Sequence, residues 1–163
     1  MGNKAFVTFF MLVAVAAVAV AQTKISGTVQ CAKPDPQHMI QVGDRPGHAY
    51  SINQSKCTWT KPWEAGGTQS KEDIVTAFAE ISGDQSREHG LVVGAMANGD
   101  KIYIRLQGSA TLKDGAPQTS EGKWTFQRGT GKIKGIKGSG TYKGKGSADG
   151  LTFEVEGEYT LPK

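Results

Sequence analysis

The segment GSGTYKGKGSADGLTFEVEGEYT, residues 138–160, contains two alternating runs separated by the pair Asp149-Gly150. Alternation with a period of two is typical of β-strands, and Asp-Gly is a favoured turn of a β-hairpin. A hairpin with this turn brings two oppositely charged pairs together on the outer surface: Lys145 with Glu154, and Lys143 with Glu156. Glycines of the first run then lie under aromatic or branched residues of the second, which is typical of a strongly curved sheet.

The rest of the chain repeats this organisation. It contains 22 glycines in 163 residues, both at turns and inside alternating segments. Eight strands are expected, at 24–32, 47–60, 71–82, 88–97, 101–112, 121–128, 138–146 and 151–160. Turn sequences separate them and no long helix intervenes, so the sheet should be antiparallel. The sequence therefore predicts an all-β fold, a single eight-stranded antiparallel barrel.

Segment 70–82 also has some features of a helix. Ser70 and Asp73 have the spacing of a capping box, and the apolar residues Ile74, Phe78 and Ile81 have helical spacing. A helix here would leave a seven-stranded sheet with an unprotected edge. A strand is therefore preferred.

A second hairpin is expected around Asn98-Gly99, a pair that suits a type I′ turn. This turn predicts three opposed pairs: Gly94 with Tyr103, Val93 with Ile104, and Leu91 with Leu106. One face of the hairpin would then form part of the core, composed of Leu91, Val93, Ala95, Ile102, Ile104 and Leu106.

The N-terminus has the features of a secretory signal peptide. Lys4 precedes the apolar stretch 5–20, and the small-residue triplet 19–21 is typical of a cleavage site. We expect residues 1–21 to be removed and residues 22–163 to form one domain, exported to the periplasm or the exterior. No membrane span is expected in the mature chain.

The mature chain has two cysteines, Cys31 and Cys57. In an oxidising compartment a disulfide between them is expected. The alternative, a pair of metal-binding or reactive thiols, lacks short spacing and neighbouring ligands.

The charge pattern does not indicate a nucleic-acid partner. The net charge is only +4. The basic tract 123–145 is interpreted as solvated charge rather than an anion site. Residues 129–132, Gly-Thr-Gly-Lys, lack the other residues of a phosphate-binding loop, and no cofactor is expected.

No catalytic or metal constellation is visible in the sequence. The histidines, His38, His48 and His89, are too dispersed to indicate a metal site, and no Ser-His-Asp or Cys-His pattern has supporting context. The tryptophans are interpreted as core residues rather than a sugar platform. No catalytic residue is assigned.

The segment GTGKIKGIKGSGTY, residues 129–142, preceded by Trp124-Thr125-Phe126, resembles the signature of the allene oxide cyclase and dirigent barrels and their small secreted bacterial relatives. The clearest match covers residues 121–160. The resemblance implies an allene oxide cyclase-like or calycin-like barrel in which Ile133 and Ile136 cover the base. The working residues of those families lie in earlier strands, where no position of this chain matches, so the resemblance carries no activity over.

The strand directions predict which loops share an end of the barrel. The turns 61–70, 98–99 and 129–137 share one end, where four bulky residues would act as a plug: Pro62, Trp63, Ile133 and Ile136. The other loops form the mouth. His48, Tyr50 and His89 lie near it, and we expect them to bind the polar end of a ligand, with the His89 ring pointing inward and His48 close to it.

Three functions remain open at this point. The first is a binding barrel that holds a small, largely apolar ligand in its interior. The second is a cyclase or isomerase of the allene oxide cyclase type, and an interior carboxylate or histidine beside an empty cavity would favour it. The third is a non-catalytic envelope or surface interaction protein that makes contact through the lysines near residues 129–138. The oligomeric state is not predicted.

Overall fold

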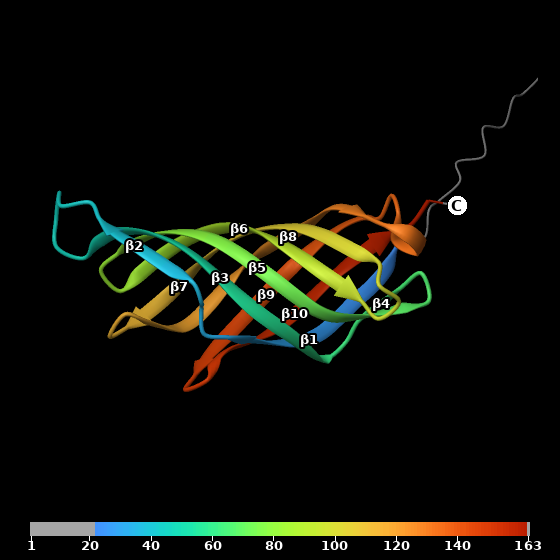
Figure 1. The fold of residues 1–163 in the computed structure, drawn as a ribbon, viewed down its shortest axis with the longest axis horizontal. Coiled ribbons are helices and arrows are strands. Elements are labelled where there is room, and N and C mark those ends of the chain that lie inside the picture. The colour runs from blue at the N-terminus through green and yellow to red at the C-terminus, as the bar shows by residue number, and fades with distance from the viewer. Residues whose placement is uncertain (1–21, 163) are drawn as a thin grey trace, which may run out of the picture.

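Eight strands close into an antiparallel ring in the computed structural model, which describes residues 22–162 (Figure 1). In ring order they are β1 (Thr23–Ala32), β3 (His48–Lys61), β5 (Thr68–Ser82), β6 (Gln85–Met96), β7 (Lys101–Lys113), β8 (Ala116–Gly129), β9 (Lys137–Ser147) and β10 (Gly150–Thr160), and β10 pairs with β1. The predicted barrel is confirmed, and segment 71–82 is strand β5. The expected signal peptide lies outside the described residues.

Two short strands lie outside the ring. Strand β2 (Gln37–Gln41) pairs with the first part of β3, and β4 (Glu64–Ala65) pairs with the start of β5. A 3₁₀ turn, η1 (Gly131–Ile133), precedes β9. Within residues 22–162, the structure has no helix with the length and hydropathy needed to span a membrane.

The shortest ladder of the ring joins β1 to β3. Their ladder contains four residue pairs, from Thr28 opposite Lys61 to Cys31 opposite Cys57, and it includes an irregularity. On its other side, β1 pairs with β10 along its whole length, from Thr23 opposite Tyr159. The disulfide Cys31–Cys57 joins β1 to β3 at this short ladder. The predicted disulfide is thus present, and it joins the two strands that share the shortest ladder of the ring.

The β9–β10 hairpin has the predicted facing but a register shifted by two residues. Residues 148–149 form the turn, so Lys143 lies opposite Glu154 and Lys145 lies opposite Thr152. The expected partners were wrong because Gly150 begins β10 instead of completing the turn. A shift of two leaves each side chain on the same face of the sheet, and all four charged side chains are exposed.

The β6–β7 hairpin was predicted one residue out of register. Gly99 has a positive φ of 89° and Asn98 is not among the residues with positive φ, so the turn is not type I′. Residues 97–100 form a longer loop, and Val93 lies opposite Tyr103. A slip of one residue turns every side chain of β6 to the other face.

This slip corrects part of the predicted core. Leu91 is 52% exposed and Val93 is 40% exposed, while Val92 and Met96 are buried in their place. Ala95 also changes face, whereas the β7 residues expected in the interior are there: Ile102, Ile104 and Leu106.

One end of the barrel is plugged as predicted. Ile133 is completely buried, and Ile136 and Trp63 are also buried in the main hydrophobic cluster. Ala65 and Met96 belong to the same cluster. Pro62 is exposed and is not part of the plug. The plug and the C-terminus lie at the same end, to the right in Figure 1.

Candidate binding site

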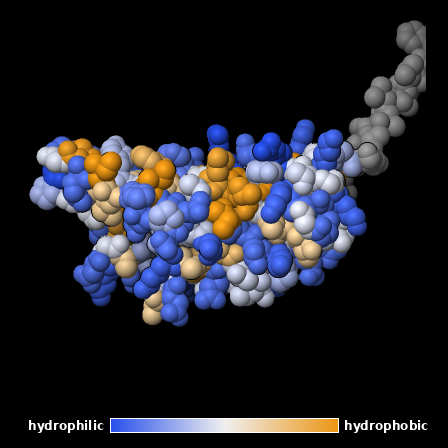
Figure 2. All heavy atoms as spheres, viewed as in Figure 1, coloured by the Kyte–Doolittle hydropathy of each residue, from blue (hydrophilic) through white to orange (hydrophobic). Residues whose placement is uncertain are grey.

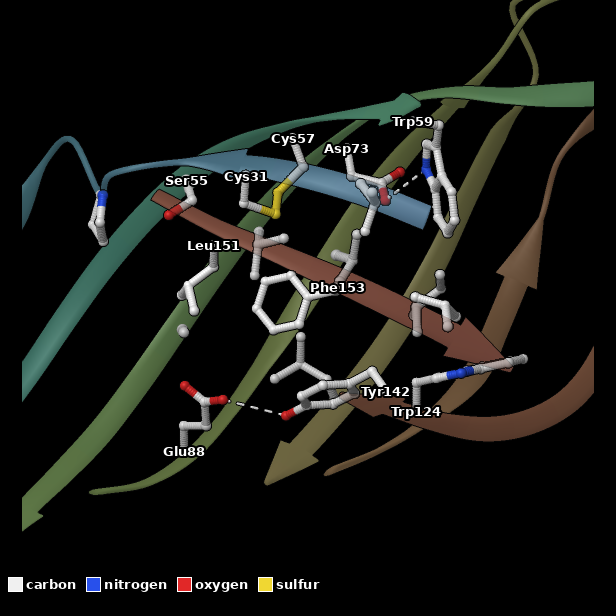
Figure 3. A pocket seen from close by; sticks show the side chains of 18 of the residues that line it. Cys31, Ser55, Cys57, Trp59, Asp73, Glu88, Trp124, Tyr142, Leu151 and Phe153 are labelled. Atoms are coloured by element: carbon white, nitrogen blue, oxygen red, sulfur yellow. Dashed lines mark hydrogen bonds between the residues drawn. A yellow bond between two sulfur atoms is a disulfide. The ribbon is translucent and has the colours of Figure 1, made fainter. Parts of the chain in front are cut away.

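A cavity of about 190 Å³ lies inside the barrel, above the plug (Figure 3). Its wall extends from Trp63 at the plugged end to Pro34, Pro117 and Leu151 near the opposite loops. Most of the lining is aliphatic or aromatic. The aromatic side chains are Trp59, Trp63, Trp124, Phe126, Tyr142 and Phe153.

The aromatic floor of the cavity is held in place by packing and hydrogen bonds. The ring of Phe126 lies 4.8 Å from that of Trp124 and 5.6 Å from that of Trp63, measured between centroids. The Trp124 indole N–H donates to the backbone oxygens of Thr141 and Glu156, each at 3.2 Å. The floor therefore presents fixed aromatic surfaces to any molecule in the cavity.

Trp124 fits there because glycines lie next to its ring. A Cβ atom at Gly140 or Gly157 would lie about 2.5 Å from Cζ2 of Trp124, closer than non-bonded carbon atoms can approach. The glycine-rich strands thus thin the barrel wall where a large side chain must lie against it.

Asp73, on β5, is a buried carboxylate in the cavity wall. Its Oδ2 accepts a hydrogen bond of 3.0 Å from the indole N–H of Trp59. Burial raises the pKa of Asp73 to about 7, and the hydrogen bond from Trp59 opposes this rise only in part. Within residues 22–162, no donor is hydrogen-bonded to its other oxygen, Oδ1.

Gly94 on β6 makes room for this oxygen, because any side chain at that position would collide with it. A Cβ atom at position 94 would lie 2.5 Å from Oδ1 of Asp73. Gly94 pairs with Asp73 across the β5–β6 ladder. The carboxylate is therefore oriented by Trp59 through Oδ2, while Oδ1 lies against Gly94 without a hydrogen-bond donor from residues 22–162.

Glu88, on β6, is the second carboxylate of the lining. Its Oε1 accepts hydrogen bonds from Ser120 Oγ at 2.9 Å and from the Tyr142 hydroxyl at 3.3 Å. Burial, followed by the charge of Glu88, raises the pKa of Tyr142 above its ordinary value, so the phenol stays a donor. Figure 3 shows Asp73 and Glu88 on opposite sides of the cavity.

The titratable lining is acidic. Among the described residues that line this cavity, Asp73 and Glu88 are the carboxylates, and none is a lysine, arginine or histidine. In residues 22–162 no group of three or more His, Cys, Asp and Glu side chains is arranged to hold a metal ion.

The residues predicted to form the mouth lie elsewhere. The His48 ring is buried under the loop before β3, with Nδ1 2.5 Å from Oδ1 of Asp44 and Nε2 3.2 Å from Oε1 of Glu80. The hydrogen bond with His48 lowers the pKa of Asp44. His48 thus fastens the 42–47 loop and does not line the cavity.

Tyr50 and His89 lie on the outer wall. Phe78 lies between them, with its ring 5.5 Å from Tyr50 and 5.2 Å from His89. The expected inward direction of His89 is wrong because it shares the face of Leu91 and Val93, which the register of β6 places outside. The two histidines lie in the same half of the barrel, on its outer side. Ligand binding by His48, Tyr50 and His89 stays a prediction.

These aromatic residues belong to an exposed apolar stripe across β2, β3, β5 and β6. Its members are Ile40, Tyr50, Ile52, Phe78, Leu91 and Val93. Figure 2 shows hydrophobic side chains exposed on the face that carries these strands.

Sequence reasoning missed both interior carboxylates. Asp73 was noticed only as part of a capping box, although it has the strand parity of Val75 and Ala77. Glu88 has the parity of Val92, but the predicted register placed that parity outside. A correct hairpin register would have identified Glu88 as an interior residue.

Comparisons with known proteins define the fold only. No protein-family model matches the sequence, and no curated protein is significantly similar to it. A solved structure of a protein of unknown function from the DUF3224 family of Shewanella oneidensis is similar, with a TM-score of 0.51 and 12% sequence identity. The match covers 88% of this chain and 99% of that chain. The barrel expected from the resemblance is supported, and no comparison points to allene oxide cyclases or dirigent proteins in particular.

Proposed function

We propose that the mature domain is an exported binding protein that holds one small, largely apolar molecule inside the barrel. The cavity beside the aromatic floor is the observation that carries the proposal. Its volume of about 190 Å³ is slightly larger than an engineered protein cavity of about 150 Å³ that binds benzene. A compound with one ring, or a short branched chain, is therefore the right size.

Export is supported by two independent features. The first 21 residues have the sequence pattern of a signal peptide. The disulfide Cys31–Cys57 is consistent with an oxidising compartment, where such bonds persist. Mass spectrometry of protein from the periplasm or the medium should find a chain that begins near Gln22 with no free thiol. An uncleaved or reduced chain would contradict export.

Binding can be tested with one-ring compounds, using the fluorescence of the tryptophans that line the cavity. A filled variant, Ala77→Phe, should lose binding because Ala77 lines the cavity and a phenyl ring would occupy it. Thr76→Phe is the matched control, since Thr76 is the exposed neighbour of Ala77 on β5. Equal binding by wild type, Ala77→Phe and Thr76→Phe would place the ligand outside the barrel and overturn the proposal.

Asp73 favours a second candidate, an acid–base isomerase or cyclase that works in the same cavity. A carboxyl group with a pKa of about 7 can both donate and accept a proton near neutral pH. Mass spectrometry in deuterated water would detect exchange of a carbon-bound hydrogen in a bound ligand. Exchange that disappears in Asp73→Asn, with binding retained, would support the enzyme; binding without exchange would reject it.

A further inference from the structure

We propose that the cavity selects a small organic cation, an amine on a one-ring or short branched apolar body. Its ammonium group would bind Asp73 while the apolar part lies against Trp63, Trp124 and Phe126. This inference rests on the proposed binding function and adds the chemical class of the ligand.

The first argument is charge. The described residues of the lining include two carboxylates and no cationic side chain. A buried carboxylate is costly unless an opposite charge or several hydrogen bonds compensate it. An anionic ligand would add to this cost, whereas an ammonium group would remove it.

The second argument is the hydrogen bonding of Asp73. Trp59 holds Oδ2 at 3.0 Å and so fixes the carboxylate plane. Oδ1 lies against Gly94, accepts no hydrogen bond from residues 22–162, and belongs to a side chain that lines the cavity. The carboxylate is oriented and has one oxygen available, which suits a charged N–H donor.

The third argument separates the roles of the two carboxylates. Glu88 already accepts two hydroxyl hydrogen bonds on Oε1, from Ser120 and Tyr142. Asp73 has a single donor among residues 22–162, the indole N–H of Trp59. The ligand's polar group is therefore assigned to Asp73, and Glu88 contributes its charge from the opposite wall (Figure 3).

The fourth argument is the aromatic surroundings. Cations are attracted to the faces of tryptophan, tyrosine and phenylalanine rings, and desolvation strengthens this attraction. Six aromatic side chains line the cavity. The rings of Trp59 and Trp63 lie 6.4 Å apart at an interplanar angle of 76°, so their faces point in different directions around the site.

Calorimetry with three probes of nearly equal shape can test the inference. Benzylamine is cationic, benzyl alcohol is neutral and benzoate is anionic at about pH 8. We expect benzylamine to bind about tenfold or more tightly than benzyl alcohol, and benzoate not to bind. In Asp73→Asn most of this preference should disappear while the binding of benzyl alcohol is retained. Glu72→Gln, an exposed carboxylate next to Asp73, is the control and should keep the preference.

The pH dependence supplies a second readout. Asp73 becomes protonated as the pH falls below about 7, so the affinity for benzylamine should fall between about pH 8 and pH 5. The affinity of Asp73→Asn for benzylamine should change little over this range. Circular dichroism would verify that the variant is folded.

The outcomes distinguish the two proposals. If benzyl alcohol binds wild type as tightly as benzylamine, or if benzoate binds best and more tightly at low pH, the organic-cation inference is overturned and the binding function stands. If a wide panel of one-ring compounds, the three probes included, fails to bind wild type, both proposals fail.

Discussion

Asp73 lowers the stability of the barrel when it is ionised. Its carboxyl group has a pKa of about 7 in the folded protein against an ordinary value of 3.8. Between these values the unfolded chain loses the proton while the folded chain keeps it, so the free energy of unfolding decreases as the pH rises through this window. Above about pH 7 this decrease in the free energy of unfolding is complete.

Asp73→Asn should therefore stabilise the protein at about pH 8, by on the order of 3 kcal/mol. An amide oxygen can still accept the hydrogen bond from Trp59, and no charge is buried. The difference from wild type should shrink towards zero at about pH 4. Urea denaturation at a series of pH values measures it, and a constant difference across the series would contradict the buried charge as its cause.

Two glycines of β9 differ in what surrounds them. A Cβ atom at Gly140 would collide with the backbone of Glu156 and Gly157 as well as with Trp124, whereas one at Gly144 would meet the ring of Phe153. Backbone on the neighbouring strand cannot move away without breaking the ladder. Phe153 lines the cavity and has space to move into.

Gly140→Ala should cost roughly 3 kcal/mol or more, and Gly144→Ala about 1 kcal/mol. Both residues lie in the same strand, so the change in strand propensity is the same. Chemical denaturation of the two variants gives the comparison. Similar losses would mean that the wall at Gly140 adapts more easily than its contacts indicate.

At the scale of single strands, the sequence predicted which segments form strands, and where they lie, better than which face of each strand points inward. The Asn98-Gly99 turn shows why: the side-chain oxygen of Asn98 accepts a hydrogen bond from the backbone N–H of Asp100. The Asp100 carboxylate in turn accepts one from the backbone N–H of Lys132, 32 residues further along. This long-range contact holds a longer loop, which no local turn rule includes.

Strands β5 and β6 also have apolar residues on both faces. Ile74 and Phe78 alternate with Val75 and Ala77 on β5, and Leu91 and Val93 flank Val92 on β6. Alternation shows that such a segment is a strand but not which side is buried. For this reason the interior carboxylates could not be identified from the sequence. Each shares its strand parity with apolar residues that the alternation pattern could equally well have placed outside.

The short ladder between β1 and β3 should be the first part of the ring to open once the disulfide is removed. Replacing Cys31 and Cys57 together by alanine should lower the free energy of unfolding by about 3 kcal/mol. Amide hydrogens in the four-residue β1–β3 ladder should then exchange faster than those between β1 and β10. Equal acceleration on both sides of β1 would show that the barrel opens as a whole.

At the scale of the whole molecule, the order of turns was sufficient to predict closure and the plugged end. In an up-and-down barrel alternate connections share an end, so the 61–70 and 129–137 segments had to meet. Trp63, Ile133 and Ile136 are buried together there. The cavity, in contrast, depends on how completely side chains from eight strands fill the interior, and no local pattern records that volume.

The pairing of Thr23 with Tyr159 makes the barrel well suited to circular permutation. A short Gly/Ser linker could join the two ends of the mature domain, and new termini could be placed at the exposed Asp114-Gly115 turn. This permutant should fold and retain its melting temperature to within a few degrees, since every ladder is kept. Opening the chain at Gly135, between the buried Ile133 and Ile136, should strongly destabilise it. The ring of ladders, rather than the order in which the ribosome makes the strands, would then define the folded unit.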